Sequence, residues 1–336
     1  MKLFAPAVLG LSLVATSAFT AGCDCGGGKA RPLDEGPSYL VITVGGLQGF
    51  ADKTGNVVIK PVFERALKFS EGLAPVMIMD KWGYVDTKGW LAIKPAYDHA
   101  LPFTEGLAVA ATGNLFGFID KKGEFAVPPV FEMAFQFSEG LAAAMQGGKW
   151  GYVNRSGRFA IEPQFDDHFL GFFEGLAAVK MGEWWGFIDK KGKVVIPGQY
   201  DLAFHFSEGL APVVTGEDCG YIDKTGRLAI PQQYDYTLHF KEGLAPVAVE
   251  DTWGYIDKTG ALQIKYLFDD AQPFMDGLAA VRKGEKWGYI DKTGKMVIAP
   301  SYDAAGEFHD GVAAVVVGDR LGYIDKVGRF VWEPTN

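Results

Sequence analysis

The chain has 336 residues, of which 48% are hydrophobic and 22% are charged, a composition typical of a globular protein that buries a core. Its formal net charge is −9, and its acidic residues are spread along the whole chain. This balance argues against a nucleic-acid-binding role, because affinity for a phosphate backbone rests on a basic patch.

The first 38 residues predict an exported and anchored protein. Residues 1–22 have the basic residue and the apolar run of a secretory signal peptide. Cys23 follows an Ala-Gly pair, which resembles the lipobox of bacterial lipoproteins, and the resemblance implies that Cys23 is acylated. Thr20 departs from the usual leucine, so ordinary cleavage that leaves Cys23 and Cys25 as thiols is the alternative. Residues 23–38 are predicted to be a flexible linker.

Residues 39–336 are built from one repeated unit. The glycine in the stretch KWGYIDKTGKMVIAP (residues 286–300) recurs every 34 residues, with a single interval of 35. A functional site is built once and a structural unit many times, so this stretch is predicted to be structural. The copies of the glycine are Gly49, Gly83, Gly117, Gly151, Gly186, Gly220, Gly254, Gly288 and Gly322.

Each unit has the pattern of a three-stranded antiparallel meander. Gly-Tyr-Ile-Asp is rich in strand-forming residues, Asp-Lys-Thr-Gly is a hairpin turn that the Asp side chain can cap, and Lys-Met-Val-Ile is the returning strand. A crossover with an aromatic–acid pair and a phenylalanine leads to Glu-Gly-Leu-Ala-Ala-Val, the third strand. The sequence therefore predicts an all-β array of about nine such repeats.

This combination of period and motif resembles the WG-repeat family, also called KWG repeats, over residues 39–333. We expect the tryptophans to pack as a ladder between neighbouring units and the following glycines to let another backbone lie close. The rival interpretation is that the rings bind sugars. The resemblance implies a bacterial protein, often secreted or lipid-anchored, with no assigned biochemical activity. The pairs are Trp82-Gly83, Trp150-Gly151, Trp185-Gly186, Trp253-Gly254 and Trp287-Gly288.

The array could be an open superhelix or a closed ring. The first unit begins with a strand at residues 39–44 and the last ends with a strand at residues 329–332, so both ends complete whole sheets. Closed propellers typically have about four to eight blades and often share one blade between the two ends of the chain. We therefore predict an open, superhelical solenoid, with a closed β-propeller-like ring as the alternative.

The sequence predicts no catalytic, metal or cofactor site. No serine elbow, H-E-x-x-H motif, phosphate loop or dinucleotide fingerprint occurs. His205 and His239 stand at equivalent positions in adjacent units and could bind a metal, but we favour two surface residues. Cys219 replaces a ladder tryptophan and is expected to be a buried small hydrophobe. The Asp-Lys turns carry one acid each, too few to bind calcium.

The turns before Trp-Gly vary between units and are mostly acidic, which predicts a binding edge. We predict a binding or scaffolding surface in the bacterial cell envelope, held at the cell membrane or outer membrane by the lipid, with an unknown envelope protein or glycan as partner. An envelope enzyme acting on glycans and a structural spacer are the alternatives, and a secreted or periplasmic protein is the alternative location. The candidate residues of the edge are Trp184, Glu217, Asp218, Asp251 and Glu285.

Overall fold

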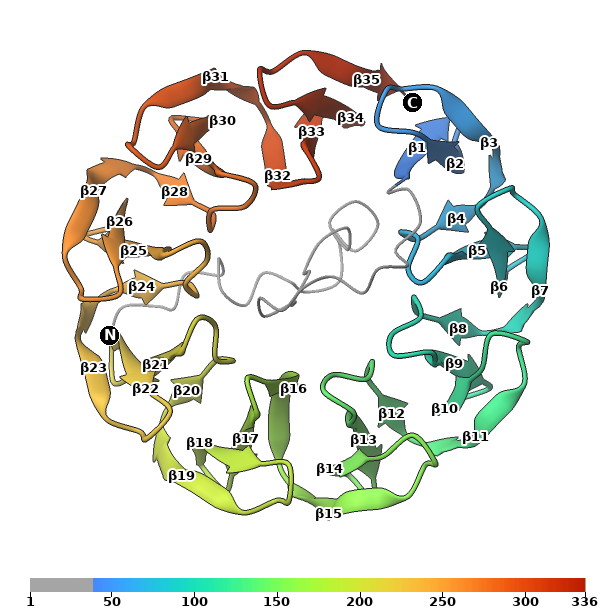
Figure 1. The fold of residues 1–336 in the computed structure, drawn as a ribbon, viewed down its shortest axis with the longest axis horizontal. Coiled ribbons are helices and arrows are strands. Elements are labelled where there is room, and N and C mark those ends of the chain that lie inside the picture. The colour runs from blue at the N-terminus through green and yellow to red at the C-terminus, as the bar shows by residue number, and fades with distance from the viewer. Residues whose placement is uncertain (1–38, 336) are drawn as a thin grey trace.

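The computed structural model describes residues 39–335, which form nine small antiparallel sheets arranged in a ring around a central opening (Figure 1). These residues are strands and turns, and none of them belongs to a helix that could cross a membrane. Each sheet is one blade of a β-propeller, numbered 1 to 9 in chain order. The predicted signal peptide, Cys23 and the linker lie outside the described residues.

The strands of each blade follow one another from the central opening to the outer wall. The first strands are β4 (Arg65–Ala66), β8 (His99–Ala100), β12 (Met133–Ala134), β16 (Asp167–Phe173), β20 (Leu202–Ala203), β24 (Tyr236–Thr237), β28 (Asp270–Ala271) and β32 (Ala304–His309). The second strands are β1 (Leu40–Val44), β5 (Leu73–Ile78), β9 (Ala108–Thr112), β13 (Ala142–Gln146), β17 (Leu176–Met181), β21 (Leu210–Thr215), β25 (Leu244–Val249), β29 (Leu278–Lys283) and β33 (Val312–Val317).

The outer half of each blade is a hairpin closed by an Asp-x-x-Gly turn, which in blade 4 is Asn-x-x-Gly at residues 154–157. The third strands are β2 (Leu47–Ala51), β6 (Lys81–Asp86), β10 (Leu115–Ile119), β14 (Lys149–Val153), β18 (Trp184–Asp189), β22 (Asp218–Asp223), β26 (Thr252–Asp257), β30 (Lys286–Asp291) and β34 (Arg320–Asp325). The fourth strands are β3 (Val57–Phe63), β7 (Leu91–Tyr97), β11 (Phe125–Phe131), β15 (Phe159–Phe165), β19 (Val194–Tyr200), β23 (Leu228–Tyr234), β27 (Leu262–Phe268), β31 (Met296–Tyr302) and β35 (Phe330–Thr335).

Eight of the nine blades have four strands, where the sequence predicted three. The additional strand comes from the crossover and pairs with the second strand of the same blade; it has only two residues in six of these blades, whereas β16 and β32 have seven and six. In blade 2, the N–H groups of Glu64 and Leu67 donate to the carbonyls of Met77 and Pro75 at 3.1 and 2.9 Å. So short a strand has no alternating pattern that a sequence could reveal.

The ring is closed, so the open superhelix that we predicted is wrong and the closed propeller is right. Blade 9 meets blade 1 through Lys53 Nζ, which lies 3.1 Å from Asp310 Oδ2, and through the Tyr323 hydroxyl, which donates to the Val41 carbonyl at 2.8 Å. In the described residues the two ends meet across the junction of blades 9 and 1 instead of sharing a blade. Both ends of the array complete whole sheets in a closed ring as well, so this feature of the sequence could not distinguish a closed ring from an open superhelix.

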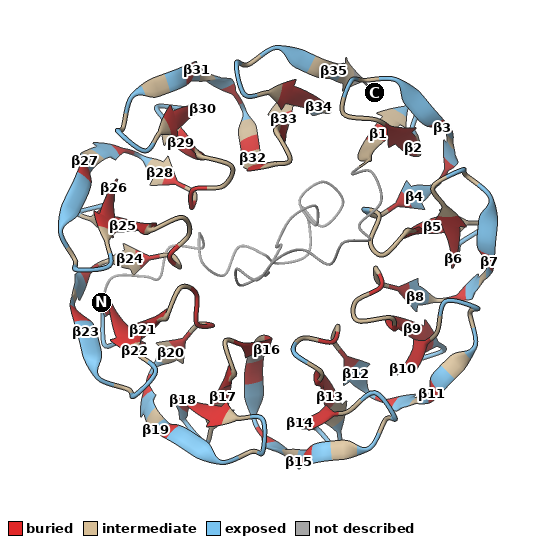
Figure 2. Cartoon of the chain, in the orientation of Figure 1, coloured by how far each residue is buried: buried red, intermediate tan, exposed pale blue. Residues whose placement is uncertain are grey.

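The core lies mainly between neighbouring blades, and the outermost strands are largely exposed (Figure 2). Its regular element is a ring pair: Tyr84 of blade 2 packs on Phe103 of blade 3 with centroids 5.0 Å apart. Equivalent pairs occur at each of the other junctions from blade 1 through blade 9, seven more in all, for example Tyr221 with Phe240 at 4.9 Å. The tyrosine or phenylalanine after Trp-Gly thus builds the continuous ladder that we had expected the tryptophans to build.

The tryptophans of the repeats lie beside this ladder. Trp82, Trp150 and Trp185 are buried, whereas Trp253 and Trp287 are half-buried. Each is paired in register with the aromatic residue at the end of the fourth strand, as Trp82 is with Tyr97. This placement favours a packing role over sugar binding, because a buried ring is closed to a glycan.

Candidate binding surface

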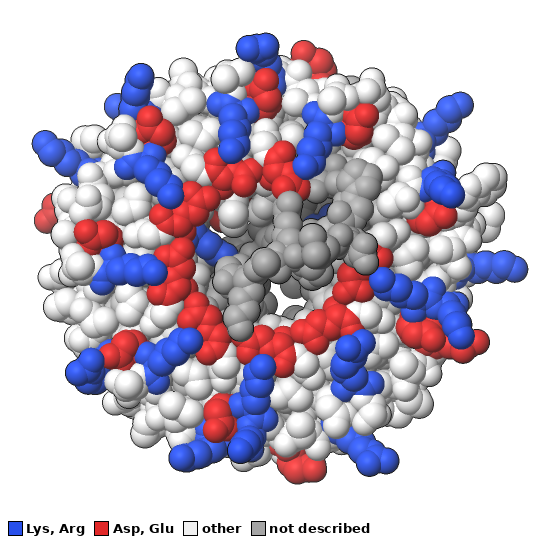
Figure 3. All heavy atoms as spheres, viewed as in Figure 1, with Lys and Arg blue, Asp and Glu red and all other residues white. Residues whose placement is uncertain are grey.

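The turns of the ring lie on its two flat faces, which differ in chemistry. On one face, here called the collar face, lie the turns between first and second strands and those between third and fourth strands. On the opposite face, here called the hairpin face, lie the turns between second and third strands. Figure 3 shows a ring of acidic side chains around the central opening, with basic side chains just outside it.

The acids of the collar face are held by the neighbouring blade. Glu174, for example, accepts a hydrogen bond from the Gly209 N–H at 3.1 Å and forms a 3.0 Å ion pair with Lys224. Six of the eight collar acids form an ion pair with a lysine of the next blade, and the other two accept a hydrogen bond from a glycine N–H of that blade. These carboxylates therefore join blades and are poor candidates for ligand binding. The collar acids are Glu71, Glu105, Glu139, Glu174, Glu208, Glu242, Asp276 and Asp310.

In the Asp-Lys turns, the aspartate and the lysine interact with different parts of the protein. The Asp223 carboxylate caps its own turn, accepting hydrogen bonds from the Thr225 hydroxyl and N–H, and these bonds lower the pKa of Asp223 to about 2. Lys224 reaches the preceding blade instead of its neighbour in sequence. The sequence predicted that the aspartate caps its turn. It did not predict the lysine clamp, by which we mean the contact of a collar acid with a glycine N–H and a lysine of the next blade, although these three residues recur at fixed offsets.

The hairpin face carries exposed acids in every hairpin of blades 5 to 9 but in only one hairpin of blades 1 to 4, that of Asp80. In blades 1 to 4 the hairpin pairs are Gly-Gly, Met-Asp, Gly-Asn and Gly-Gly, whereas every hairpin of blades 5 to 9 contains an acid. The carboxylates of these hairpins are exposed and make no hydrogen bond or ion pair within residues 39–335. We call them the acidic crescent: Glu183, Glu217, Asp218, Glu250, Asp251, Glu285 and Asp319.

The crescent contains all four acids of the predicted binding edge and lies beside its tryptophan. Trp184 begins β18 next to Glu183 and is 44% exposed. It stands over Gly198 of the fourth strand, where a Cβ would lie 3.3 Å from the Trp184 Cβ. Most other blades carry proline at the position of Gly198. The structure therefore places the five predicted edge residues on one face, in four adjacent blades.

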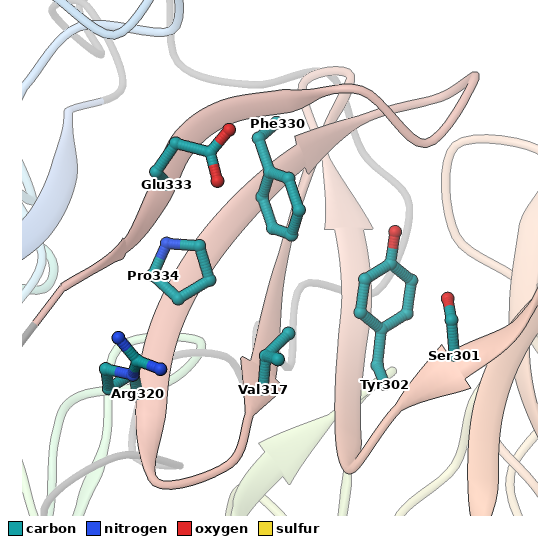
Figure 4. A pocket seen from close by; sticks show the side chains of 7 residues that line it. All are labelled: Ser301, Tyr302, Val317, Arg320, Phe330, Glu333 and Pro334. Carbon is teal, nitrogen blue, oxygen red and sulfur yellow. The ribbon is translucent and has the colours of Figure 1, made fainter.

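A groove that the sequence did not predict lies between blades 8 and 9, where their outermost strands meet the last hairpin (Figure 4). Its volume is about 450 Å³. Phe330 is 38% exposed and packs edge-on against Tyr302, with ring centroids 6.3 Å apart. The lining combines four apolar or aromatic side chains with two charged ones: Tyr302, Val317, Phe330, Pro334, Arg320 and Glu333.

Two histidines that we had expected at the surface pack together on the inner side of the ring. The rings of His205 and His239 lie 4.9 Å apart, and His205 is buried. Burial lowers the pKa of His205 to about 4 and that of His239 to about 3. Among residues 39–335, no three His, Cys, Asp or Glu side chains gather closely enough to hold a metal ion.

Cys219 and His168 are likewise buried. Burial raises the pKa of the Cys219 thiol to about 11, which disfavours the thiolate that a nucleophile requires. His168 belongs to the only 35-residue interval, where the extra residue lengthens β16, and it packs 4.1 Å from the ring of Trp150. Cys219 follows the crescent residue Asp218 in β22, but its side chain is buried, and neither Cys219 nor His168 lines the groove.

Comparison with known proteins adds a family and a fold. The model described as "WG containing repeat" matches residues 49–82, 82–115, 116–150, 150–183, 185–217, 220–253, 253–287 and 287–320. No curated protein matches. A crystal structure of a eukaryotic initiation factor is similar at 10% identity and a TM-score of 0.65, covering 90% of this chain and 97% of that one. The dihydro-heme d1 dehydrogenase NirN is similar at 12% identity and a TM-score of 0.51, covering 92% and 76%. At these identities the likeness concerns the fold alone.

Proposed function

The chain belongs to the family of WG containing repeat proteins, and on that premise we propose that it is a binding scaffold that captures a positively charged protein on the acidic crescent. The observation that carries the proposal is the difference between the two faces. The collar acids are matched by lysines and glycine N–H groups of the next blade, whereas the crescent acids have no partner within the described residues. Charge complementarity guides association and sets specificity, so the natural ligand of such a surface is basic.

The groove gives less support to the alternative of an enzyme acting on glycans. Glycoside hydrolysis generally uses two carboxylates on either side of the scissile bond. The groove between blades 8 and 9 is lined by a single carboxylate, that of Glu333. A pure spacer would not explain why exposed acids occupy every hairpin of one half of the ring and one hairpin of the other.

The test compares two triple variants of equal charge. In the crescent variant, Glu217→Gln, Asp218→Asn and Glu285→Gln remove three charges; in the control, Asp80→Asn, Glu124→Gln and Glu162→Gln remove three exposed acids from blades 2 to 4. Fluorescence anisotropy with labelled octalysine is expected to show about tenfold weaker binding to the crescent variant, since each exposed charge pair contributes about 0.5 kcal/mol.

The control variant is expected to bind octalysine like the parent protein, and octaglutamate is expected not to bind at all. Equal losses in the two triple variants would mean that only net charge matters, and the crescent would then be no site. If both variants bound octalysine as tightly as the parent protein, the crescent would not be the binding site of a basic partner, and the proposal would be wrong.

The proposal places the scaffold in the bacterial cell envelope, attached through a lipid on Cys23. Its support is the sequence alone, since these residues lie outside the described part. We expect the native protein to partition into detergent and to carry the mass of a diacylglyceryl group, and the Cys23→Ser variant to lose both. A soluble, unmodified parent protein would contradict the lipid anchor and favour secretion. It would not bear on the proposal that the crescent binds a basic protein.

A further inference from the structure

The groove between blades 8 and 9 contains Arg320, which forms no ion pair within the described residues, whereas lysines at the equivalent position of other blades pair with an aspartate. Lys81, Lys149 and Lys286 occupy the position of Arg320 in other blades, and each pairs with an aspartate that opens the following blade, as Lys286 does with Asp303 at 2.5 Å. The blade after Arg320 is blade 1, and the residue one 34-residue period before Glu64 is Ala30, which has no carboxylate. Arg320 accordingly forms no ion pair within residues 39–335.

The groove has an apolar floor and two charged ends. Val317, Phe330 and Pro334 offer the aliphatic and aromatic surface, and Figure 4 shows Pro334 lying between the guanidinium of Arg320 and the carboxylate of Glu333. Like Arg320, Glu333 forms no ion pair within the described residues. An apolar trough that ends in an unpaired carboxylate matches the two parts of a long basic side chain, its alkyl stem and its charged head.

We infer that the groove receives one arginine side chain of the basic partner, with its stem on Val317, Phe330 and Pro334 and its guanidinium at Glu333. Phe330, with its exposed ring, can also face the guanidinium and add a cation–π contact. Arg320 repels a cation at the opposite end, so it directs the incoming head toward Glu333. This inference rests on the proposed function, because it specifies how the partner of the crescent is anchored.

Position also connects the groove with the crescent. Asp319 is the residue before Arg320, in the hairpin of blade 9, and Glu285 stands in the hairpin of blade 8. The same two blades supply the walls of the groove. A basic segment that follows the crescent therefore reaches the groove at its end, and the surrounding charge favours arginine over an uncharged or acidic side chain.

The experiment uses the full chain and two labelled nonapeptides. One has the sequence Lys-Gly-Lys-Gly-Arg-Gly-Lys-Gly-Lys, and in the other the central arginine is replaced by citrulline, which keeps the shape and removes the charge. Anisotropy is expected to show about fivefold tighter binding of the arginine peptide, as for a partly desolvated charged hydrogen bond. Glu333→Gln should abolish that preference, and Arg320→Gln should increase it.

Opposite changes in the two single variants distinguish this anchoring from its rivals. An acidic occupant would reverse both signs, and equal binding of the two peptides by the parent protein would overturn the inference. Binding that is lost in the crescent variant but indifferent to Glu333→Gln would reject the groove and keep the crescent. Peptide binding that is weakened by Glu333→Gln but unchanged in the crescent variant would reject the crescent and keep the groove. Unfolding midpoints of all variants establish that each is folded.

Discussion

Replacing Gly288 with alanine is expected to lower the free energy of unfolding by about 3 kcal/mol, the range of overpacking in a tightly packed interior. A Cβ built on Gly288 would lie 2.5 Å from the Ile298 carbonyl oxygen and 2.7 Å from the Pro300 nitrogen. Both are backbone atoms of β31, and the register shifts at this point between Trp287 and Tyr289. Backbone cannot rotate away as a side chain can, so the two strands must separate.

Gly306→Ala is the matched control, since it adds the same methyl group in the neighbouring blade. There the Cβ would meet Ala314 at ordinary contact distances, its carbonyl oxygen at 3.5 Å and its Cβ at 3.8 Å, and the backbone of Gly306 is not in the left-handed region. Urea unfolding followed by circular dichroism should give a lower midpoint for Gly288→Ala and a nearly unchanged one for Gly306→Ala. Equal midpoints for the two variants would show that the strands of blade 8 yield easily.

The sequence predicted those features that one repeat encodes by itself. The turn at Asp223 is an example, because the capping carboxylate, the threonine that it binds and a glycine with φ of 83° lie within four consecutive residues, ending at Gly226. The angle between two blades is not encoded in any single unit, so closure of the ring could not be read from the period. For the same reason, the presence of whole sheets at both ends led us to predict an open superhelix where the structure is a closed ring.

The candidate site was predicted in the same uneven manner. Glu217 and Asp218 were found because they stand in a turn whose composition varies between repeats. The groove was missed because its walls come from two blades and because Arg320 is unusual only when the ring places blade 9 beside blade 1. The lysine clamp, by contrast, had a usable signal: Glu174, Gly209 and Lys224 are separated by offsets that recur in the next repeats.

The stability of the ring is expected to fall as the pH decreases from about 6.5 toward 4, because the buried His168 and His205 and the half-buried His239 must remain neutral. Burial lowers the pKa of His168 and His205 to about 4 and that of His239 to about 3, below the value of 6.5 for an exposed histidine. Between these values the unfolded chain binds more protons than the folded one, so stability rises with pH in this window. The shifts of His168 and His205 each correspond to about 3 kcal/mol, and that of His239 to about 5 kcal/mol.

Nearby charges do not cancel this effect. Asp167 favours the protonated form of His168, and Glu174 does so for His205, but burial outweighs both carboxylates. Lys241 acts in the same direction as burial, because it opposes protonation of both His205 and His239. Replacing His168 and His205 by phenylalanine keeps ring-on-ring packing and removes two of the titrating groups. Urea midpoints at about pH 7 and about pH 4.5 should therefore differ much less in this variant than in the parent.

His99→Phe provides the control for the acid transition, because His99 is exposed and its ring stacks on Phe116 at 6.0 Å. That variant should keep the full pH dependence of the parent protein. If the double variant of His168 and His205 loses stability in acid as steeply as the parent, the transition belongs to other groups. The collar carboxylates would be the next to examine, since their protonation breaks the clamps between blades, and high salt would then weaken the ring at neutral pH as well.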